Sequence, residues 1–504
     1  MQRDLSRLSG TEHDVVVVGG GIHGACVAWD ATLRGLRVAL VEREDFGGAT
    51  SANSLRIVHG GLRYLARGDF RRMRESIEER SAFLRIAPTL VEPLAVLVPT
   101  RGLGTQSRPA LGTALALNDL LSLDRNRGLD AAHRLSRGGL LSTARCRQLF
   151  PSFPDEGVSG GALWHDARMR HPERLTLAFV RAAADRGAVA ANYCGMERLL
   201  HDGGVARGVV AADLLGGGTL EVRGRTVVVA GGPWTGALAT DGAIRPQAFA
   251  LNLVIGRRLA EVAVGMRALT GAEEDPVIGG RRFIFLVPQD ETTFLGTWYA
   301  TAEGRTPAEL VRLGEAALLS EFQAACPALE LDAADVVRSQ WGWLPLRTGR
   351  ERGRATALAD RPVVIDHGAT AGLGGMFSVE GVKYTTARRV AADVVDRVVA
   401  RLNAVTDRCR TDQVRVDEGE GTGDASLDGR VRRAVREEMA VRLSDVVLRR
   451  IGAGAPPKPA AATVVSAAEI AGQELGWTRE RQDTEIEDVM QQVRTVGPIG
   501  EPRA

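Results

Sequence analysis

The stretch that decides the fold is residues 14–42, DVVVVGGGIHGACVAWDATLRGLRVALVE. It opens on four consecutive valines, Val15–Val18, a run typical of a strand that is buried on both faces. The glycine-rich residues 19–24 follow directly, and residues 25–33 have the composition of a helix. Residues 37–41 then return to a β-branched and aliphatic pattern. The stretch therefore predicts a β-α-β unit with a glycine turn between its first strand and its helix.

The glycines of this turn match the pattern G-x-G-x-x-G, which binds dinucleotides when a strand precedes it and a helix follows. Gly19 permits the tight turn, Gly21 lets the backbone approach a pyrophosphate, and Gly24 lets the helix pack closely on the strand. Glu42 closes the second strand and can accept hydrogen bonds from a ribose. An ordinary glycine-rich turn is the alternative. Strand, helix, second strand and acid in register favour a dinucleotide site.

Composition bounds the class of protein. The chain has 504 residues, 44% hydrophobic and 25% charged, which suits a globular protein of roughly two or three domains. A net charge of +2 gives no case for a nucleic-acid partner. The 5 cysteines are scattered without CxxC spacing, which argues against a metal site and for a reducing compartment. With no secretory signal and no run of about 18 apolar residues, we expect a cytoplasmic protein without a membrane span.

Two further segments point to a large flat cofactor. Small residues follow Glu42 at positions 45–54, including Thr50 and Ser51, where a nicotinamide enzyme would begin a helix sooner. Such a loop lets the backbone lie along a flavin and favours FAD over NAD. A buried strand at residues 225–230 also ends in glycines, so that Gly232 can approach the same cofactor.

A third glycine-rich segment, residues 372–386, contains Gly375 and Thr385 and precedes a helix that runs to about Leu402. A helix that begins at a cofactor site presents its positive end to the ligand. We therefore predict that this segment favours negative charge on a reduced flavin ring.

The pattern of predicted strands and helices changes after residue 242. Paired strands and a helix over residues 243–344 predict a mixed-sheet substrate domain inserted into a Rossmann-like FAD-binding domain, which covers about residues 12–242 and 345–408. Together these parts form an oxidoreductase region over residues 1–410. Residues 411–504 are predicted to form a small helical C-terminal domain. The predicted fold class is α/β with an α+β substrate part.

Chemistry-bearing residues are sparse in these patterns. The segment LRIVHGGLRYL at 55–65 carries His59 and Arg63 around a Gly-Gly pair. By itself this pattern reads as a buried structural histidine and a surface arginine.

Several motifs together resemble the FAD-dependent glycerol-3-phosphate dehydrogenase/oxidase family, over nearly the whole chain. HGGLRYL matches that family at every position, whereas GVKYTTAR is looser. The matching motifs are VVVVGGGIHGA at 15–25, ATSANS at 49–54, IVHGGLRYL at 57–65, AGGPW at 230–234, RRFIFLVP at 281–288, LGTWY at 295–299, GVKYTTARRVAA at 381–392 and DVVLRR at 445–450.

The resemblance implies a hydride transfer from a secondary alcohol to N5 of FAD, with glycerol 3-phosphate giving dihydroxyacetone phosphate. Electrons would then pass to a quinone or to oxygen. His59 and Arg63 would lie at the reacting end, and Lys383 and Arg282 would bind the substrate anion. We also expect peripheral contact with the inner face of the cell membrane and a homodimer.

Two departures from the family concern the substrate. Leu344 stands where the family has an arginine that binds phosphate, and the apolar residues 250–254 stand where it has a histidine. Arg347 is a candidate replacement, and Trp341 and Trp343 suit a bulkier or less charged substrate. Oxidation of another hydroxy compound, an amine or an amino acid is therefore an alternative. A flavin-binding protein without catalysis is a further one.

Overall fold

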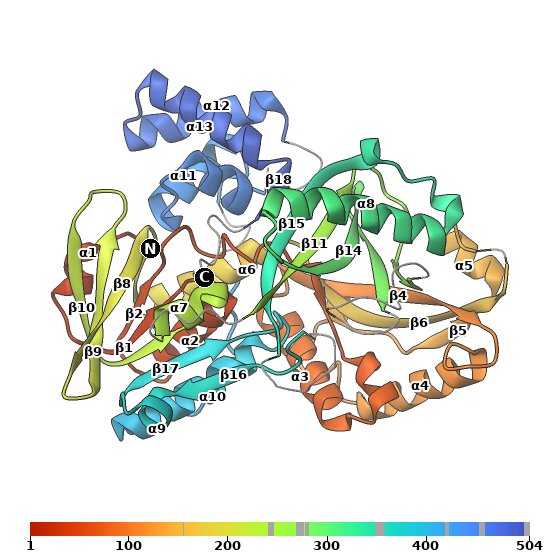
Figure 1. The fold of residues 1–504 in the computed structure, drawn as a ribbon, viewed down its shortest axis with the longest axis horizontal. Helices are drawn as coiled ribbons and strands as arrows, with labels where there is room; N and C mark the ends of the chain where they lie inside the picture. The colour runs from red at the N-terminus through yellow and green to blue at the C-terminus, as the bar shows by residue number, and fades with distance from the viewer. Residues whose placement is uncertain are drawn as a thin grey trace.

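The computed structural model contains two β-sheets side by side and a lobe of helices formed by the C-terminal part of the chain (Figure 1). The predicted domain boundary at residues 242–243 lies outside the described residues, as do residues 498–504. The structure describes residues 1–154, 156–239, 246–268, 277, 282–347, 358–418, 423–452 and 459–497.

The first sheet is the predicted Rossmann-like one. Its central strands pair in parallel, and β16 joins the edge in antiparallel orientation. The four valines of the first strand are at most 4% exposed, as their continuous run predicts. The strands, in spatial order, are β16 (Val363–Asp366), β17 (Met376–Glu380), β10 (Thr219–Val229), β1 (His13–Val18), β2 (Val38–Val41) and β7 (Val189–Ala191).

Both faces of this sheet are covered. One face packs against α2 (Ile22–Leu33), α6 (Pro172–Ala184) and α10 (Ala387–Leu402). The other face packs against α1 (Leu5–Ser9) and the antiparallel pair β8 (Cys194–Asp202) and β9 (Val205–Asp213). Because β1, β2, β10 and β17 are parallel, their carboxyl ends lie at one edge, where ligands of such sheets bind.

The second sheet draws strands from both halves of the chain. The predicted insertion supplies β11 to β15, but β4 pairs in parallel with β12, and β6 pairs with β4. The strands are β3 (Ile57–Val58), β4 (Val91–Arg101), β5 (Gly139–Leu141), β6 (Val158–Met169), β11 (Gln247–Ile255), β12 (Ala263–Arg267), β13 (Phe283–Gln289), β14 (Thr292–Thr301), β15 (Val336–Pro345) and β18 (Thr495–Val496).

Helices surround this second sheet. The predicted helix of the substrate part is α8 (Pro307–Ala325), which packs on one sheet face and starts with a capping box at Thr306. The helices α4 (Arg108–Leu121) and α5 (Thr143–Leu149) pack near β6, and α3 (Phe70–Ile86) lies between the two sheets (Figure 1). The short helices α7 (Thr235–Ala239) and α9 (His367–Ala371) lie beside β17.

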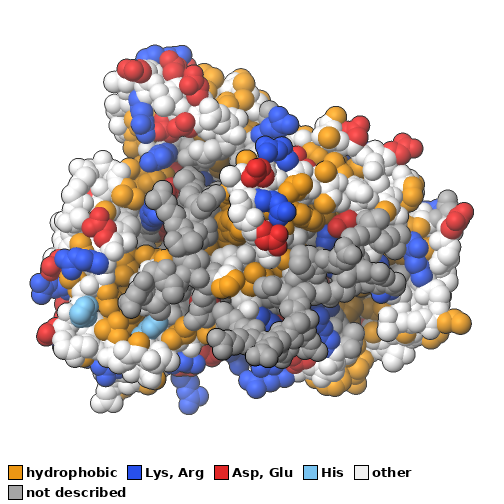
Figure 2. Space-filling model, in the orientation of Figure 1, with side chains coloured by type: hydrophobic (Ala, Val, Ile, Leu, Met, Phe, Trp, Pro, Cys, Tyr) orange, Lys and Arg blue, Asp and Glu red, His pale blue; other side chains and the backbone are white. Residues whose placement is uncertain are grey.

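The C-terminal lobe has its own apolar core and contains α11 (Leu427–Glu438), α12 (Ala461–Leu475) and α13 (Arg479–Gln492). Helix α11 ends at Glu438, because Met439 takes a left-handed conformation (φ 56°), and the chain resumes as a π-helical turn at Asp445–Arg450. The lobe carries acidic and basic side chains intermixed on the face shown in Figure 2. No helix in the described part of the chain is long and apolar enough to cross a membrane.

Candidate active site

The glycine turn after β1 has the geometry that its motif predicts. Gly19 has φ 102°, and a Cβ there would lie 2.5 Å from the carbonyl oxygen of Ala230. A Cβ on Gly24 would overlap the carbonyl oxygen of Gly19, so α2 can pack here only on a glycine. Gly21 differs, because the Ser51 hydroxyl is the one described atom within 4 Å of a Cβ built there. The space before the N-terminus of α2 is thus open to a ligand such as a pyrophosphate.

The acid at the end of β2 is held beside this turn. Glu42 accepts hydrogen bonds from the backbone N–H of Gly20 (2.5 Å) and of Glu44 (2.8 Å). Burial raises the pKa of the Glu42 carboxyl despite these two hydrogen bonds. The Ser51 hydroxyl accepts the N–H of Ile22 (3.0 Å) at the start of α2. An open cradle with an acid at its rim fits the pyrophosphate and ribose of FAD.

The other strand ends complete this edge, with one correction. Gly232 has φ 58° directly after β10, and Thr385 is buried in the loop that leads into α10. Gly375, in contrast, lies at the amino end of β17, with Arg225 as a neighbour. Since β17 is parallel to β10, Gly375 lies at the sheet edge opposite the glycine turn. The prediction was wrong because it read residues 372–386 as one loop, whereas a strand separates its two parts.

His59 is held by a carboxylate that the sequence did not single out. It follows β3, which pairs with β6, and its Nδ1 lies 3.5 Å from Oδ2 of Asp166 on β6. Half of the His59 side chain is exposed (50%), so it is not a buried structural histidine. Its ring meets that of Phe285 edge to face at 6.1 Å. With Nδ1 facing a carboxylate, Nε2 is the ring nitrogen left to accept a proton.

Asp166 itself is buried and strongly anchored. It accepts hydrogen bonds from the backbone N–H of Gly60 (2.7 Å) and from the guanidinium of Arg80 (2.9 Å). Burial alone would raise the pKa of Asp166, but the contacts with His59 and Arg80 outweigh it and lower that pKa to about 2. Asp166 is therefore an anion at neutral pH. In the sequence, Asp166 is marked only by its position beside His165, and the pairing of β6 with β3 is what brings it to His59.

Cationic side chains surround one buried tyrosine. Lys383, in the loop after β17, donates a hydrogen bond to the hydroxyl of Tyr64. The guanidinium carbons of Arg63 and Arg72 lie 5.2 Å and 5.7 Å from the centre of the same ring. Burial and the charge of Arg63 lower the pKa of Lys383 to about 7. The two segments lie 319 positions apart in sequence, and their meeting creates a site where an anion would relieve repulsion.

The two other predicted anion ligands, Arg347 and Arg282, do not contact Tyr64 in the structure as Arg63 and Lys383 do. Arg347 is exposed and pairs with Asp360 (2.7 Å), which also pairs with Arg72 (3.0 Å), so Arg347 borders the cationic group. Arg282 is buried and pairs with Glu321 on α8. Strand residues alternate between faces, so Arg282 points to the α8 side whereas Phe285 points to His59. Arg282 is therefore not brought to the site.

The two tryptophans of β15 are core residues, which corrects their expected role at the substrate. Trp341 is 7% exposed and stacks on Phe249, with ring centres 5.2 Å apart, and Trp343 packs in the same core. The intervening Gly342 faces the other way, and a Cβ there would lie 3.0 Å from Thr50. Leu344 shares that face by alternation. Leu344, and neither tryptophan, therefore faces the loop of residues 45–54 that carries Thr50.

A parallel sheet with this glycine turn, beside a second sheet that carries His59 at its edge, is the architecture of a flavin-type oxidoreductase. Within the ranges that the structure describes, no group of His, Cys, Asp and Glu is arranged to hold a metal ion.

Comparison with known proteins agrees with this class. Residues 14–397 match the family of FAD-dependent oxidoreductases, and residues 377–482 match the C-terminal domain of alpha-glycerophosphate oxidase. Glycerol-3-phosphate dehydrogenase 1 of Mycobacterium tuberculosis is 31% identical over 414 residues, which cover 81% of this chain and 77% of the relative. Glycerol-3-phosphate dehydrogenase of Synechocystis is 30% identical over 427 residues, covering 81% and 74%.

A solved structure shares the fold. Glycerol-3-phosphate dehydrogenase from Bacillus halodurans, complexed with FAD, aligns with a TM-score of 0.72 at 23% identity and covers 98% of this chain and 97% of its own. The chain belongs to the FAD-dependent oxidoreductases and is of the glycerol-3-phosphate dehydrogenase type.

Proposed function

We propose that the protein oxidises glycerol 3-phosphate to dihydroxyacetone phosphate and passes the electrons to a quinone. One observation carries the proposal. Lys383 follows β17 at the sheet edge where the glycine turn lies, and its contact with Tyr64 brings the segment of Arg63 and of the Asp166-bound His59 to that side. This arrangement pairs a proton acceptor with an anion site, as oxidation of a phosphorylated alcohol requires. The names of the relatives support the same substrate.

FAD would be held by residues from four strand ends. The backbone of Gly19, Gly21 and Gly24 and the start of α2 suit the pyrophosphate, and Glu42 suits the ribose. Thr50, Ser51, Gly232 and Thr385 are the proposed neighbours of the remaining part. Bound FAD supplies the acceptor for the hydride that leaves the alcohol carbon.

His59 is proposed as the base. The Asp166 carboxylate faces Nδ1 of His59 and favours the tautomer that carries its proton there. This orients the ring and leaves Nε2 to take the proton of the substrate hydroxyl. A positioned base of this kind contributes roughly 10²–10⁴-fold in rate.

Arg63 and Lys383 are proposed to bind and orient the phosphate. A phosphate beside Lys383 would raise its pKa from about 7, because an opposite charge favours the protonated amine. Lys383 would therefore be charged in the substrate complex, and the two cations would fix the alcohol carbon toward the flavin. Arg347 and Arg72 would add long-range attraction from the rim.

A second candidate function follows from Leu344. This residue faces the loop of residues 45–54, at the position where the family has an arginine. Without that arginine, a hydroxy compound that lacks phosphate, or an amine or amino acid, becomes a competing substrate. Such a substrate would still use His59 and the flavin.

The test uses purified holoprotein and glycerol 3-phosphate deuterated at carbon 2. We expect a primary isotope effect on flavin reduction and dihydroxyacetone phosphate as the product. Reduction by an amine, amino acid or unphosphorylated alcohol, with none by glycerol 3-phosphate, would transfer the function to the second candidate. No reduction by any of them would support a non-catalytic flavin protein.

The electron acceptor needs its own measurement. A quinone dissolves in lipid, so the proposal includes peripheral contact with the inner face of the cell membrane. Reoxidation of the reduced protein by a water-soluble quinone should be much faster than by dissolved oxygen. Faster reoxidation by oxygen would mark an oxidase. Co-sedimentation with anionic vesicles tests the membrane contact.

A further inference from the structure

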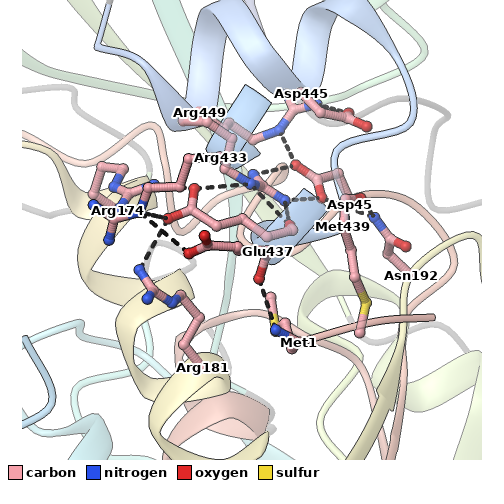
Figure 3. Close-up of polar contacts among 12 residues, drawn as sticks. Met1, Asp45, Arg174, Arg181, Asn192, Arg433, Glu437, Met439, Asp445 and Arg449 are labelled. Atoms are coloured by element: carbon pink, nitrogen blue, oxygen red, sulfur yellow. Dashed lines mark hydrogen bonds and ion pairs between the residues drawn. The ribbon is translucent and has the colours of Figure 1, made fainter. Parts of the chain in front are cut away.

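The C-terminal lobe reaches the cofactor domain through a buried ion-pair cluster (Figure 3). Asp45 lies in the loop that follows β2, and Arg450 donates to both of its carboxylate oxygens at 2.7 Å and 2.8 Å. Arg449 donates to one of these oxygens as well (2.5 Å). Both arginines belong to the π-helical turn of the lobe, about 400 positions away in sequence. Asn192 adds a fourth hydrogen bond to Asp45 (3.1 Å).

The cluster is closed to solvent and charged. Asp45 is 2% exposed and the Arg450 side chain 1%. Burial would raise the pKa of Asp45, but the charges of Arg450 and Arg449 lower it to about 2. Arg449 is fixed in turn by Asp445 (2.6 Å), which also accepts a hydrogen bond from Tyr193 (2.7 Å). The ion pairs of Asp45 with Arg449 and Arg450 are therefore formed at neutral pH.

The loop that Asp45 anchors is attached to the glycine turn. We call residues 42–47 the β2 loop. At its start Glu42 accepts the N–H of Gly20, and at its end the N–H of Gly47 donates to the carbonyl of Gly20 (3.0 Å). Between them Phe46 is fully buried, and its ring would block a Cβ on Gly20. Through Asp45, the C-terminal lobe therefore binds the β2 loop, which also carries Glu42, the proposed ligand of the ribose.

We propose that Arg449 and Arg450 are positioning residues for FAD, which hold the β2 loop and Glu42 in the conformation that binds the adenosine half of the cofactor. Neither arginine touches the expected FAD site, and both act through Asp45. A loop that is in the binding conformation for only a fraction of the time lowers cofactor affinity by that fraction. The C-terminal lobe is thereby part of the cofactor site rather than an independent partner surface.

A second contact of the same lobe provides a matched control. Glu438 on α11 is 2% exposed and pairs with Arg174 (2.6 Å) and Arg181 (2.9 Å) on α6. This contact joins the lobe to the cofactor domain through Glu438 and α6 rather than through the β2 loop. Glu438 also contacts Arg450 through its backbone carbonyl (3.1 Å), so the control changes Arg181 and not Glu438. Arg174 still holds the Glu438 carboxylate when Arg181 is lost, so the contacts of Arg450 with Asp45 should be kept.

The test measures FAD binding to the apoprotein at low temperature, by quenching of flavin fluorescence, together with the melting temperature of each apoprotein. The Arg450→Met and Asp45→Asn variants should raise the Kd for FAD about tenfold or more. The Asp45→Asn/Arg450→Met double variant should add little beyond the Asp45→Asn change, because both substitutions break the same ion pair between Asp45 and Arg450. Arg181→Gln should lower the melting temperature and leave the Kd for FAD unchanged.

The proposal is overturned if folded Arg450→Met binds FAD like the wild type, or if Arg181→Gln weakens FAD binding as much. If Arg450→Met fails to fold, the double variant Arg450→Lys/Arg449→Gln replaces it. This protein keeps one positive charge beside Asp45 and loses the contact of Arg450 with both carboxylate oxygens. An unchanged Kd for FAD in the folded double variant would also overturn the proposal.

Discussion

The Asp166→Asn variant isolates the contribution of the carboxylate behind His59. An amide at this position offers one acceptor oxygen and no charge, while the shape of the side chain is kept. The His59 ring then loses the partner that holds a proton on Nδ1. In some of the molecules, Nε2 will carry the proton and cannot act as the base.

Two magnitudes follow from the structure. The rate of flavin reduction should fall by roughly 10²–10⁴, the range that a positioned base contributes. Stability should fall as well, because the folded-state pKa of Asp166 is about 2, below its ordinary value of 3.8. That shift corresponds to about 2 kcal/mol, which is present above pH ~4 and is lost as the pH falls toward 2. The buried Arg80 adds to the loss of stability, since it loses its carboxylate partner.

The assay is anaerobic stopped-flow reduction of the bound flavin, with flavin content and melting temperature measured on the same sample. Glu79→Gln is the matched control, because Glu79 neighbours Arg80 on α3, is 1% exposed and pairs with Arg388 (3.0 Å) without touching His59. We expect the control to lose stability and to keep its reduction rate within a few-fold. The reasoning fails if Asp166→Asn with full flavin reduces at the wild-type rate, or if both variants slow equally.

Four further substitutions probe the rest of the site. Gly60→Ala should slow flavin reduction in stopped flow, because a Cβ there would overlap the guanidinium of Arg80 and disturb its pairing; wild-type kinetics would contradict this. Gly21→Val should keep the apoprotein melting temperature within a few degrees yet abolish FAD binding, and a fully yellow variant would refute the cradle. Lys383→Ala should raise KM for glycerol 3-phosphate far more than for glycerol. The wild-type KM for the anion should rise as the pH increases through about 7, where free Lys383 loses its proton, and the variant should lack that rise. Leu344→Arg should improve kcat/KM for glycerol 3-phosphate roughly tenfold or more, since a charged hydrogen bond contributes about 1.5–3 kcal/mol, and an unchanged value would mean that phosphate binds elsewhere.

The parts of the fold that could be predicted are local. The β-α-β unit at residues 14–42 follows from a valine run, three glycines and an acid, whose roles depend on neighbours within 30 positions. The second sheet could not be delimited in this way. Strand β4 joins β12 across more than 160 residues, and no local pattern specifies which distant strand completes a sheet.

The site shows the same division. The HGGLRYL motif indicated His59 and Arg63, but Asp166 depends on the register between β3 and β6. Arg282 and Trp343 were misjudged because the face to which a strand residue points depends on where the partner helix packs. The short strand β17 separates Gly375 from Gly381 and was not predicted, so Gly375 lies at the opposite edge of the sheet from the one expected.

The central claim is that this site transfers a hydride from glycerol 3-phosphate to bound FAD. An anaerobic absorbance titration of the purified holoprotein with glycerol 3-phosphate tests it directly. We predict that the band of the oxidised flavin bleaches as the substrate is added and that dihydroxyacetone phosphate accumulates in equal amount. A spectrum that stays oxidised at saturating glycerol 3-phosphate, in a protein that dithionite still reduces, would contradict the claim.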